Sequence, residues 1–196
     1  MKAILRSGFL ALAIMALAVP ANAGALGDGL AAYKRGDHAT ALRLWRPLAE
    51  QGVAEAQNNL GLMYASGEGV PQDDAEAVKW FRLAAEQGDA SGQSRLGIMY
   101  TDGKGVPQDF NEAAKWTRKA AEQGDAHAQA LLAGMYALGQ GVPTDIVLAY
   151  MWYNLAAAQG VEPAQRVKKL AVEFMTFDQI AEAQRMAREW LAEHQQ

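Results

Sequence analysis

The sequence predicts an all-α solenoid in which helix pairs stack one on the next. Residue types recur with a period of 36 positions, and glycine divides each period into two helix-length segments. Alanine occupies 40 of the 196 positions, whereas valine, isoleucine and threonine are sparse, which favours helices over sheets. One helix pair of this length buries too little apolar surface to be stable alone, so each pair must pack against its neighbours.

The repeats align without gaps. Residues 53–88 and 89–124 share 22 identities over 36 positions, and residues 125–160 continue in the same frame. We therefore predict three full repeats at 53–160, an N-terminal capping helix pair at 24–52 and C-terminal capping helices at 161–196. The recurring features are Tyr64, Tyr100 and Tyr136, then Trp80, Trp116 and Trp152, and the G-x-G-V-P loops that begin at Gly67, Gly103 and Gly139.

Glycine and aspartate mark the helix ends within a repeat. In the first repeat we predict a helix over 54–66, which Gly67 and Gly69 end. Asp73 suits the N-cap of the second helix, and Glu76 three residues later completes a capping-box pattern. The second helix should run to about residue 87.

The remaining small and aromatic residues predict how the helices pack. Gly88 suits a left-handed position that closes the second helix. Gly61, Gly97 and Ala133 lie in the middle of the first helices, where glycine is unfavourable unless another backbone approaches closely. We interpret the repeated tryptophans and tyrosines as packing residues rather than a stacking platform, with the tyrosine hydroxyls hydrogen-bonded locally.

Residues 1–23 have the pattern of a secretory signal peptide. Lys2 and Arg6 precede an uncharged apolar run over 8–19, and Ala21-Asn22-Ala23 provides a small-x-small cleavage site. The run is about a dozen residues, short of the roughly 20 that span a bilayer, so a retained anchor is the weaker alternative. We expect an exported protein, periplasmic or secreted, with no stable membrane anchor.

Composition and motifs argue against catalysis, metal or cofactor sites and nucleic-acid binding. The chain has no cysteine, which excludes thiolate nucleophiles, cysteine-ligated zinc and disulfides, and its net charge of −4 does not indicate nucleic-acid binding. None of the four serines has Lys three residues later or lies in G-x-S-x-G, and no histidine pair forms H-E-x-x-H. The glycine loops lack the phosphate-binding G-x-x-x-x-G-K-[ST] pattern. We expect no catalytic residue, no cofactor and no metal site.

The repeat unit is similar to a known family. The segment AEAQNNLGLMYASGEGVPQDDAEAVKWFRLAAEQGD (54–89) resembles the Sel-like repeat, a relative of the tetratricopeptide repeat, and MTFDQIAEAQRMAREW (175–190) resembles the terminal capping helices of bacterial members. The resemblance covers about 29–190, although the first copy lacks the glycine loop and Ala133-Gly134 shifts the usual Leu-Gly pair by one. It implies a right-handed α/α superhelix that serves as a protein-binding scaffold, often in the bacterial periplasm or envelope. It implies no shared chemistry, although some cysteine-rich members bind or slowly hydrolyse β-lactams.

The candidate binding residues are those that differ between repeats, because a position free of packing duty can vary within one chain. On the first helices these positions are spaced i, i+4, i+7 and i+11, which forms one stripe on a helix face. We expect this variable stripe to line the inner curve of the solenoid and to become more apolar toward the third repeat. Drift on an exposed face is the alternative explanation. The stripe consists of Glu55, Asn59, Leu62 and Ser66, then Ser91, Arg95, Ile98 and Asp102, and finally His127, Leu131 and Leu138.

The sequence thus predicts a non-catalytic exported adaptor. Its expected partner is a peptide or helix of an envelope protein that docks along the variable stripe. Binding of cell-wall glycan is the alternative, and it would require exposed aromatic side chains at Trp45, Trp152, Tyr153 and Trp190. A weak hydrolase is the third possibility. The oligomeric state and the partner's identity stay open.

Overall fold

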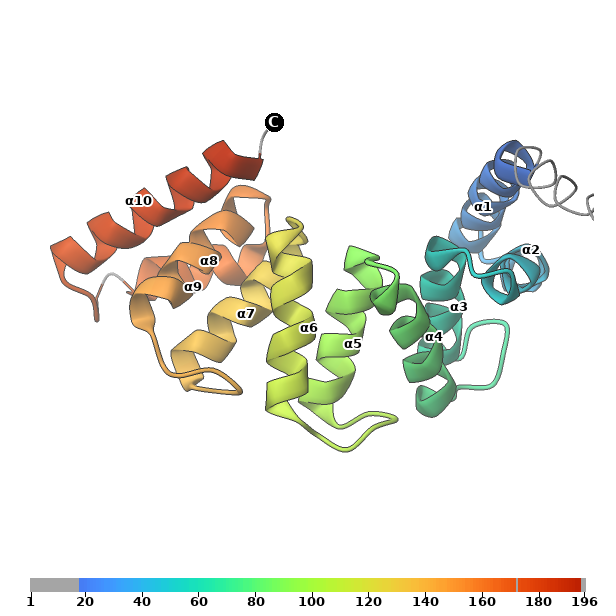
Figure 1. Cartoon of the computed structure of the whole chain (residues 1–196), viewed down its shortest axis with the longest axis horizontal. Helices are drawn as coiled ribbons and strands as arrows, with labels where there is room; N and C mark the ends of the chain where they lie inside the picture. Colours follow the sequence, from blue (N-terminus) through green and yellow to red (C-terminus); the bar gives the residue numbers. More distant parts are fainter. Residues whose placement is uncertain (1–17, 172, 195–196) are drawn as a thin grey trace, which may run out of the picture.

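The computed structural model describes residues 18–171 and 173–194, and these residues form ten α-helices with no strand (Figure 1). Each helix from α1 to α9 packs against the next one along the chain, and α10 packs on α8 at the C-terminal end. The predicted all-α solenoid of consecutive helix pairs is confirmed. The helices are α1 (Ala18–Lys34), α2 (His38–Glu50), α3 (Ala54–Ser66), α4 (Asp74–Glu86), α5 (Ala90–Asp102), α6 (Phe110–Glu122), α7 (Ala126–Leu138), α8 (Ile146–Ala158), α9 (Glu162–Ala171) and α10 (Phe177–His194).

The predicted signal peptide lies mostly outside the described residues, which begin at residue 18 within α1. Within the described part of the chain, no helix is both long enough and apolar enough to cross a bilayer.

The first and second helices of each repeat are joined by the glycine loops. Gly67, Gly103 and Gly139 are the C-caps of α3, α5 and α7, in the left-handed conformation with φ of +73°, +68° and +70°. Each of these amides donates to the methionine carbonyl four residues earlier, so the loop begins with a satisfied helix end. The three repetitions of one geometry identify the loops as structural corners.

Half of the predicted capping box forms. Asp73 accepts hydrogen bonds from the amides of Ala75 and Glu76, both at 3.0 Å, as an N-cap should. The second hydrogen bond of a capping box, from the Asp73 amide to the Glu76 carboxylate, was predicted wrongly, because that carboxylate pairs with Lys79. The Asp73 amide is already used, since it donates to the carbonyl of Tyr64 across the loop at 2.9 Å.

The second helix ends as predicted. Gly88 has a φ of +93° and donates to the Ala85 carbonyl, and the Asp89 amide donates to the Ala84 carbonyl, which together form a Schellman motif. Asp89 then caps α5 by accepting from the Gly92 amide at 2.6 Å. One short turn therefore closes one repeat and opens the next.

Close helix approach explains the small residues inside the first helices. A Cβ on Gly61 would lie 2.7 Å from the ring of Phe81, and a Cβ on Gly97 would lie 2.3 Å from the Thr117 hydroxyl. Ala133, at the equivalent position in α7, is fully buried. The predicted close approach is confirmed.

The aromatic residues follow the packing prediction in part. Trp116 and Trp152 are buried, whereas Trp80 is partly exposed at the edge of the core around Leu48 and Leu60. The repeated tyrosines are partly buried, and their hydroxyls do find local partners. Tyr64, Tyr100 and Tyr136 accept hydrogen bonds from Arg46, Arg82 and Arg118 at 3.3, 2.7 and 2.9 Å.

A ladder of buried glutamines joins successive repeats. Gln93 donates to the Ala85 carbonyl at 3.1 Å and accepts from Gln123 at 2.7 Å. Because a buried amide must be hydrogen-bonded to be tolerated, this network fixes how one pair sits on the next. The same arrangement recurs at Gln57 with Gln87 and at Gln129 with Gln159.

Candidate binding surface on the first helices

All eleven residues of the variable stripe lie on α3, α5 and α7, and none is buried. Seven are exposed and four are partly exposed, with Leu138 at 70% the most accessible leucine of the stripe. Leu131 differs from the rest because it also packs against the core of the third repeat. The stripe is therefore available to a partner along its length.

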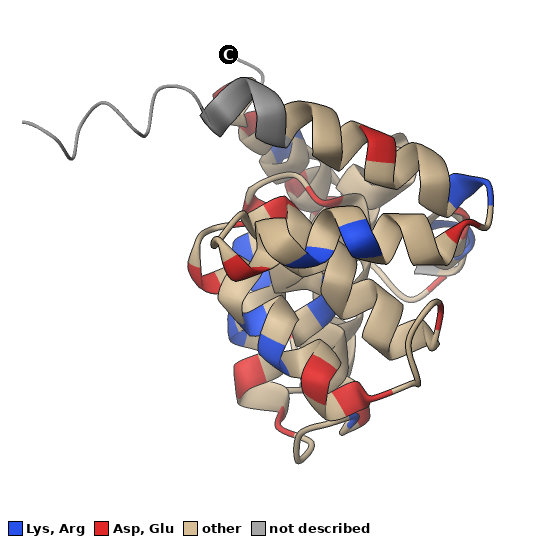
Figure 2. Ribbon diagram, turned by 90° about the vertical axis from the view of Figure 1, so that its right-hand side faces the viewer, with Lys and Arg blue, Asp and Glu red and all other residues tan. Residues whose placement is uncertain are grey.

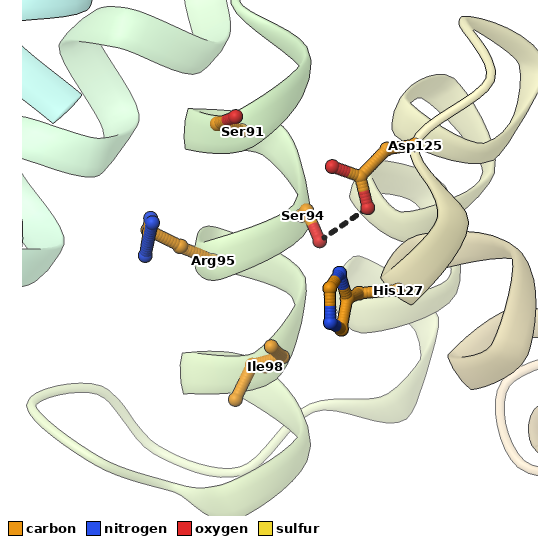
Figure 3. A pocket seen from close by; sticks show the side chains of 6 residues that line it. All are labelled: Ser91, Ser94, Arg95, Ile98, Asp125 and His127. Atoms are coloured by element: carbon orange, nitrogen blue, oxygen red, sulfur yellow. Dashed lines mark hydrogen bonds between the residues drawn. The ribbon is translucent and has the colours of Figure 1, made fainter. Parts of the chain in front are cut away.

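The structure gathers four stripe residues around one hollow. A pocket of about 310 Å³ lies between α5 and α7, and Figure 3 shows Ser91, Arg95 and Ile98 on one side with His127 on the other. We call it the α5–α7 pocket. The other seven stripe residues do not line it: Glu55, Asn59, Leu62, Ser66, Asp102, Leu131 and Leu138.

Two residues of this pocket escaped the sequence reasoning. Ser94 donates a hydrogen bond to Asp125 at 3.2 Å, and both line the α5–α7 pocket (Figure 3). Asp125 also caps α7 by accepting from the Ala128 amide at 2.7 Å. Position 94 did carry a signal, since its equivalents Asn58 and Ala130 also vary between repeats.

Arg95 is the charged centre of this surface. Its Nε donates to Asn58 at 3.0 Å, and its guanidinium lies 5.9 Å from the centre of the Phe81 ring. Burial lowers the pKa of Arg95, opposed by the nearby Asp125 and Asp89 carboxylates. Arg95 forms no ion pair within 4.0 Å among the described residues, so its terminal donors remain available to a partner.

The first end of the stripe is acidic. Glu55 and Ser66 are exposed on α3, and Glu68 follows in the loop, where its carboxylate accepts from Ser66 and from the hydroxyl of Tyr33 on α1. The Tyr33 hydrogen bond lowers the pKa of Glu68, which favours its charged form. Elsewhere on this N-terminal side of the molecule, both signs of charge are interspersed (Figure 2).

The α5–α7 pocket contains a serine, a histidine and an aspartate, but their hydrogen bonds do not follow the order of a catalytic triad. In a triad the histidine lies between the serine and the aspartate. Here the Ser94 hydroxyl donates directly to Asp125, and His127 has no hydrogen bond to either within the described part of the chain. Across residues 18–171 and 173–194, no group of three histidine or acidic side chains is placed to hold a metal ion.

The aromatic residues named for glycan binding are mostly covered. Trp45 and Trp152 are 1% and 6% exposed, so neither presents a face for a sugar ring. Tyr153 and Trp190 are partly exposed, and Trp190 packs against the Trp152 ring at 6.0 Å and stacks on His194. Of the four aromatic residues named for glycan binding, none is classed as exposed.

The periodic loops, caps and helix lengths agree with a known repeat. Four segments match the Sel1 repeat, at residues 11–53, 54–89, 90–125 and 126–161. The chain belongs to the Sel1 repeat family. The first matched segment overlaps the predicted signal peptide, and the last ends one residue before α9. No significant match was found among curated proteins.

Solved structures of Sel1 repeat proteins resemble this one. A Sel1 repeat protein from Oxalobacter formigenes is 41% identical with a TM-score of 0.60, over 65% of this chain and 96% of that protein. The protein c5321, a protective antigen present in uropathogenic Escherichia coli strains, is 31% identical with a TM-score of 0.51 over 89% of this chain. This chain spans 45% of the length of c5321. Cysteine-rich protein B of Helicobacter pylori shares the fold at 22% identity and a TM-score of 0.53, over 67% of this chain and 94% of that protein.

Proposed function

We propose that this Sel1 repeat protein is a non-catalytic adaptor that binds a segment of a partner protein along the variable stripe of α3, α5 and α7. One observation carries the proposal: the half-buried guanidinium of Arg95 lies at the α5–α7 pocket without an ion-pair partner among the described residues. A desolvated cation with free donors is a favourable site for a carboxylate of a partner. The Sel1 repeat fold, which suggests protein binding, supports the same role.

A partner segment would find different side chains at each repeat. Arg95 and Ser91 offer hydrogen bonds at the second repeat, and Leu138 offers apolar surface at the third. Specific recognition requires such a sequence of unlike contacts, because identical repeats would allow the partner to slip by one repeat.

We also propose that the protein is exported to the bacterial envelope. The support is the basic start, the apolar run and the small-x-small triplet ending at Ala23. Mass spectrometry of the N-terminus after cell fractionation tests this. Export predicts a periplasmic or secreted protein beginning at Gly24, and a cytoplasmic protein retaining Met1 would contradict it.

Crosslinking in living cells tests the adaptor role. The tagged protein is compared with the variant Arg95→Glu/Leu138→Asp, which changes two stripe positions. Melting curves of the purified variant check that it folds, because Arg95 also donates to Asn58 and lies near the Asp89 and Asp125 carboxylates. The matched control is Arg43→Glu/Leu83→Asp, which makes the same two changes on the second helices α2 and α4. We expect an envelope protein that is lost from the stripe variant and kept by the control. Equal recovery of every crosslinked protein from all three samples would refute the proposal.

A further inference from the structure

The variable stripe does not stop at the third repeat. Adding the 36-residue period to α7 places α9 (Glu162–Ala171) and the turn after it in register with the first helices. The Sel1 repeat match ends at residue 161, and the glycine loop is missing here, so neither feature marks this continuation. In this register the stripe continues with Val167, Leu170 and Phe174. Val167 is equivalent to Asn59, Arg95 and Leu131. Leu170 is equivalent to Leu62, Ile98 and Gly134, and Phe174 is equivalent to Ser66, Asp102 and Leu138.

These three continuation residues line a hollow of their own. A pocket of about 270 Å³, which we call the C-terminal pocket, is bounded by Val167, Leu170 and Phe174, with Ile146 and Tyr153 of α8 on the other side. Every residue that lines it is aliphatic or aromatic. The Tyr153 ring is half-buried there, and desolvation raises the pKa of its hydroxyl. The space suits one bulky apolar side chain.

The mouth of the C-terminal pocket is exposed apolar surface. Leu170 is 57% exposed, Phe174 is 81% exposed and Ile146 at the start of α8 is 37% exposed, and all three line the pocket. Single exposed apolar residues are ordinary, but several around one apolar hollow mark a binding surface. Elsewhere along the described helices, exposed leucines such as Leu30 and Leu83 line none of the described pockets.

The two ends of the extended stripe therefore have opposite character. Glu55 and Glu68 make the N-terminal end acidic, Arg95 is the cation near the middle, and the C-terminal pocket is apolar. A partner complementary to this order carries basic side chains at one end, a carboxylate in the middle and an apolar anchor at the other end. A protein segment is favoured over a lipid surface because charges of both signs flank the pocket: Glu173 precedes Phe174, and Lys168 and Lys169 precede Leu170.

We infer that the C-terminal pocket is the anchor site of the adaptor, and that it takes a bulky apolar side chain from a partner segment whose far end is basic. This inference rests on the proposed function, because it names the chemistry of the segment that binds along the stripe. Burial of one such side chain provides affinity, and the charges at the other end fix its direction.

The test pans a library of random peptides, displayed on phage, against the purified protein. We expect the enriched peptides to share a large apolar residue near one end and Lys or Arg near the other. Fluorescein-labelled synthetic copies then report binding by fluorescence anisotropy. Leu170→Ser should raise the dissociation constant of these peptides by about tenfold or more. The matched control, Leu83→Ser, alters a leucine of similar exposure on α4 and should bind as the wild type does.

The outcomes separate this inference from the adaptor role. Peptides that lose affinity for Arg95→Glu but not for Leu170→Ser would overturn the anchor site and leave the adaptor role standing. Peptides that depend on neither substitution, or no enrichment at all, would overturn both. If light scattering shows a dimer and Leu170→Ser abolishes it, the pocket binds a second copy of this chain. If the protein pellets with phosphatidylglycerol vesicles and Leu170→Ser abolishes the pelleting, the pocket binds lipid. Either result would overturn the inference. Circular dichroism melting curves check that Leu170→Ser folds like the wild type.

Discussion

The second glycine of each loop shows how closely successive repeats are joined, and Gly105→Ala tests that junction. Gly105 has a φ of +68°. A Cβ at this position would lie 2.2 Å from the carbonyl oxygen of Asp74 and 2.4 Å from its carbonyl carbon, in the first turn of α4. The atoms that it would meet belong to the backbone of the preceding repeat, which cannot rotate away as a side chain can. A Cβ on Gly141 would likewise lie 1.8 Å from the carbonyl oxygen of Phe110, in the backbone of the preceding repeat.

The expected loss of stability has two parts. A left-handed conformation costs an L-residue roughly 1–2 kcal/mol relative to glycine. Forcing a methyl group into a packed contact costs about 1–3 kcal/mol more. Gly103→Ala is a control with matched backbone, because Gly103 also has a φ of +68° but a Cβ there would lie 3.3 Å from its nearest neighbour, the Cβ of Gln108. The control should therefore show mainly the first part.

Urea unfolding followed by far-ultraviolet circular dichroism measures both variants. We expect Gly105→Ala to reduce the free energy of unfolding by about 2–5 kcal/mol, and to be less stable than Gly103→Ala by about 1–3 kcal/mol. Hydrogen exchange should localise the extra opening to the contact between the α5–α6 loop and α4. Equal unfolding free energies for the two variants would refute the idea that this loop joins the repeats by close backbone contact.

Three further substitutions test the inner structure. Gln93→Leu leaves the Ala85 carbonyl and the Gln123 amide without their partner, so it should reduce the free energy of unfolding by about 1–3 kcal/mol; an unchanged calorimetric melting temperature would contradict this. Trp116→Ala removes a buried ring and should cost about 3–5 kcal/mol, with hydrogen exchange rising in the second repeat before α1 and α2; uniform opening would argue against local stacking. Desolvation raises the pKa of Asp89 above its ordinary value of 3.8. The contribution of Asp89 to the free energy of unfolding is therefore fully present below pH 3.8 and is lost as pH rises through the raised pKa. Asp89→Asn still caps α5 and should therefore be more stable than wild type near about pH 7 but not near about pH 3, as urea midpoints would show.

Periodicity predicted the fold because the same local geometry had to recur. Gly88 needs a positive φ and Asp73 must cap a helix in any helix pair of this kind, so single residue types carried enough information. The capping box failed where two acceptors competed for one amide, since Asp73 donates to Tyr64 across the loop. That competition depends on tertiary geometry, which residue spacing does not contain.

The lining of the α5–α7 pocket was predictable only in part. Variation between repeats identified Arg95 and His127 as solvent-facing positions, and both line the α5–α7 pocket. Ser94 and Asp125 were missed because neither lies on the predicted stripe: Ser94 is a buried residue of α5, and Asp125 precedes α7 as its N-cap. A pocket between two helices draws side chains from the flanks of each helix, and a stripe defined on one face leaves those flanks out.

The C-terminal pocket shows why the register of a repeat is more informative than its motif. Once the glycine loop disappears, residues 161–196 resemble a cap, because the usual second helix of a fourth pair is replaced by α10 packing on α8. Nevertheless α9 packs against α8 and occupies the position of a first helix, as α3, α5 and α7 do in the three repeats. The exposed positions of α9 therefore continue the variable stripe. In such a solenoid the buried glutamines and the loop glycines hold the repeats together, while the stripe residues contribute little to that packing. Substitutions such as Leu170→Ser should therefore alter binding with little effect on unfolding, whereas Gln93→Leu should do the reverse. Loss of both properties in both variants would mean that recognition and stability share the same residues, and that the stripe is part of the fold.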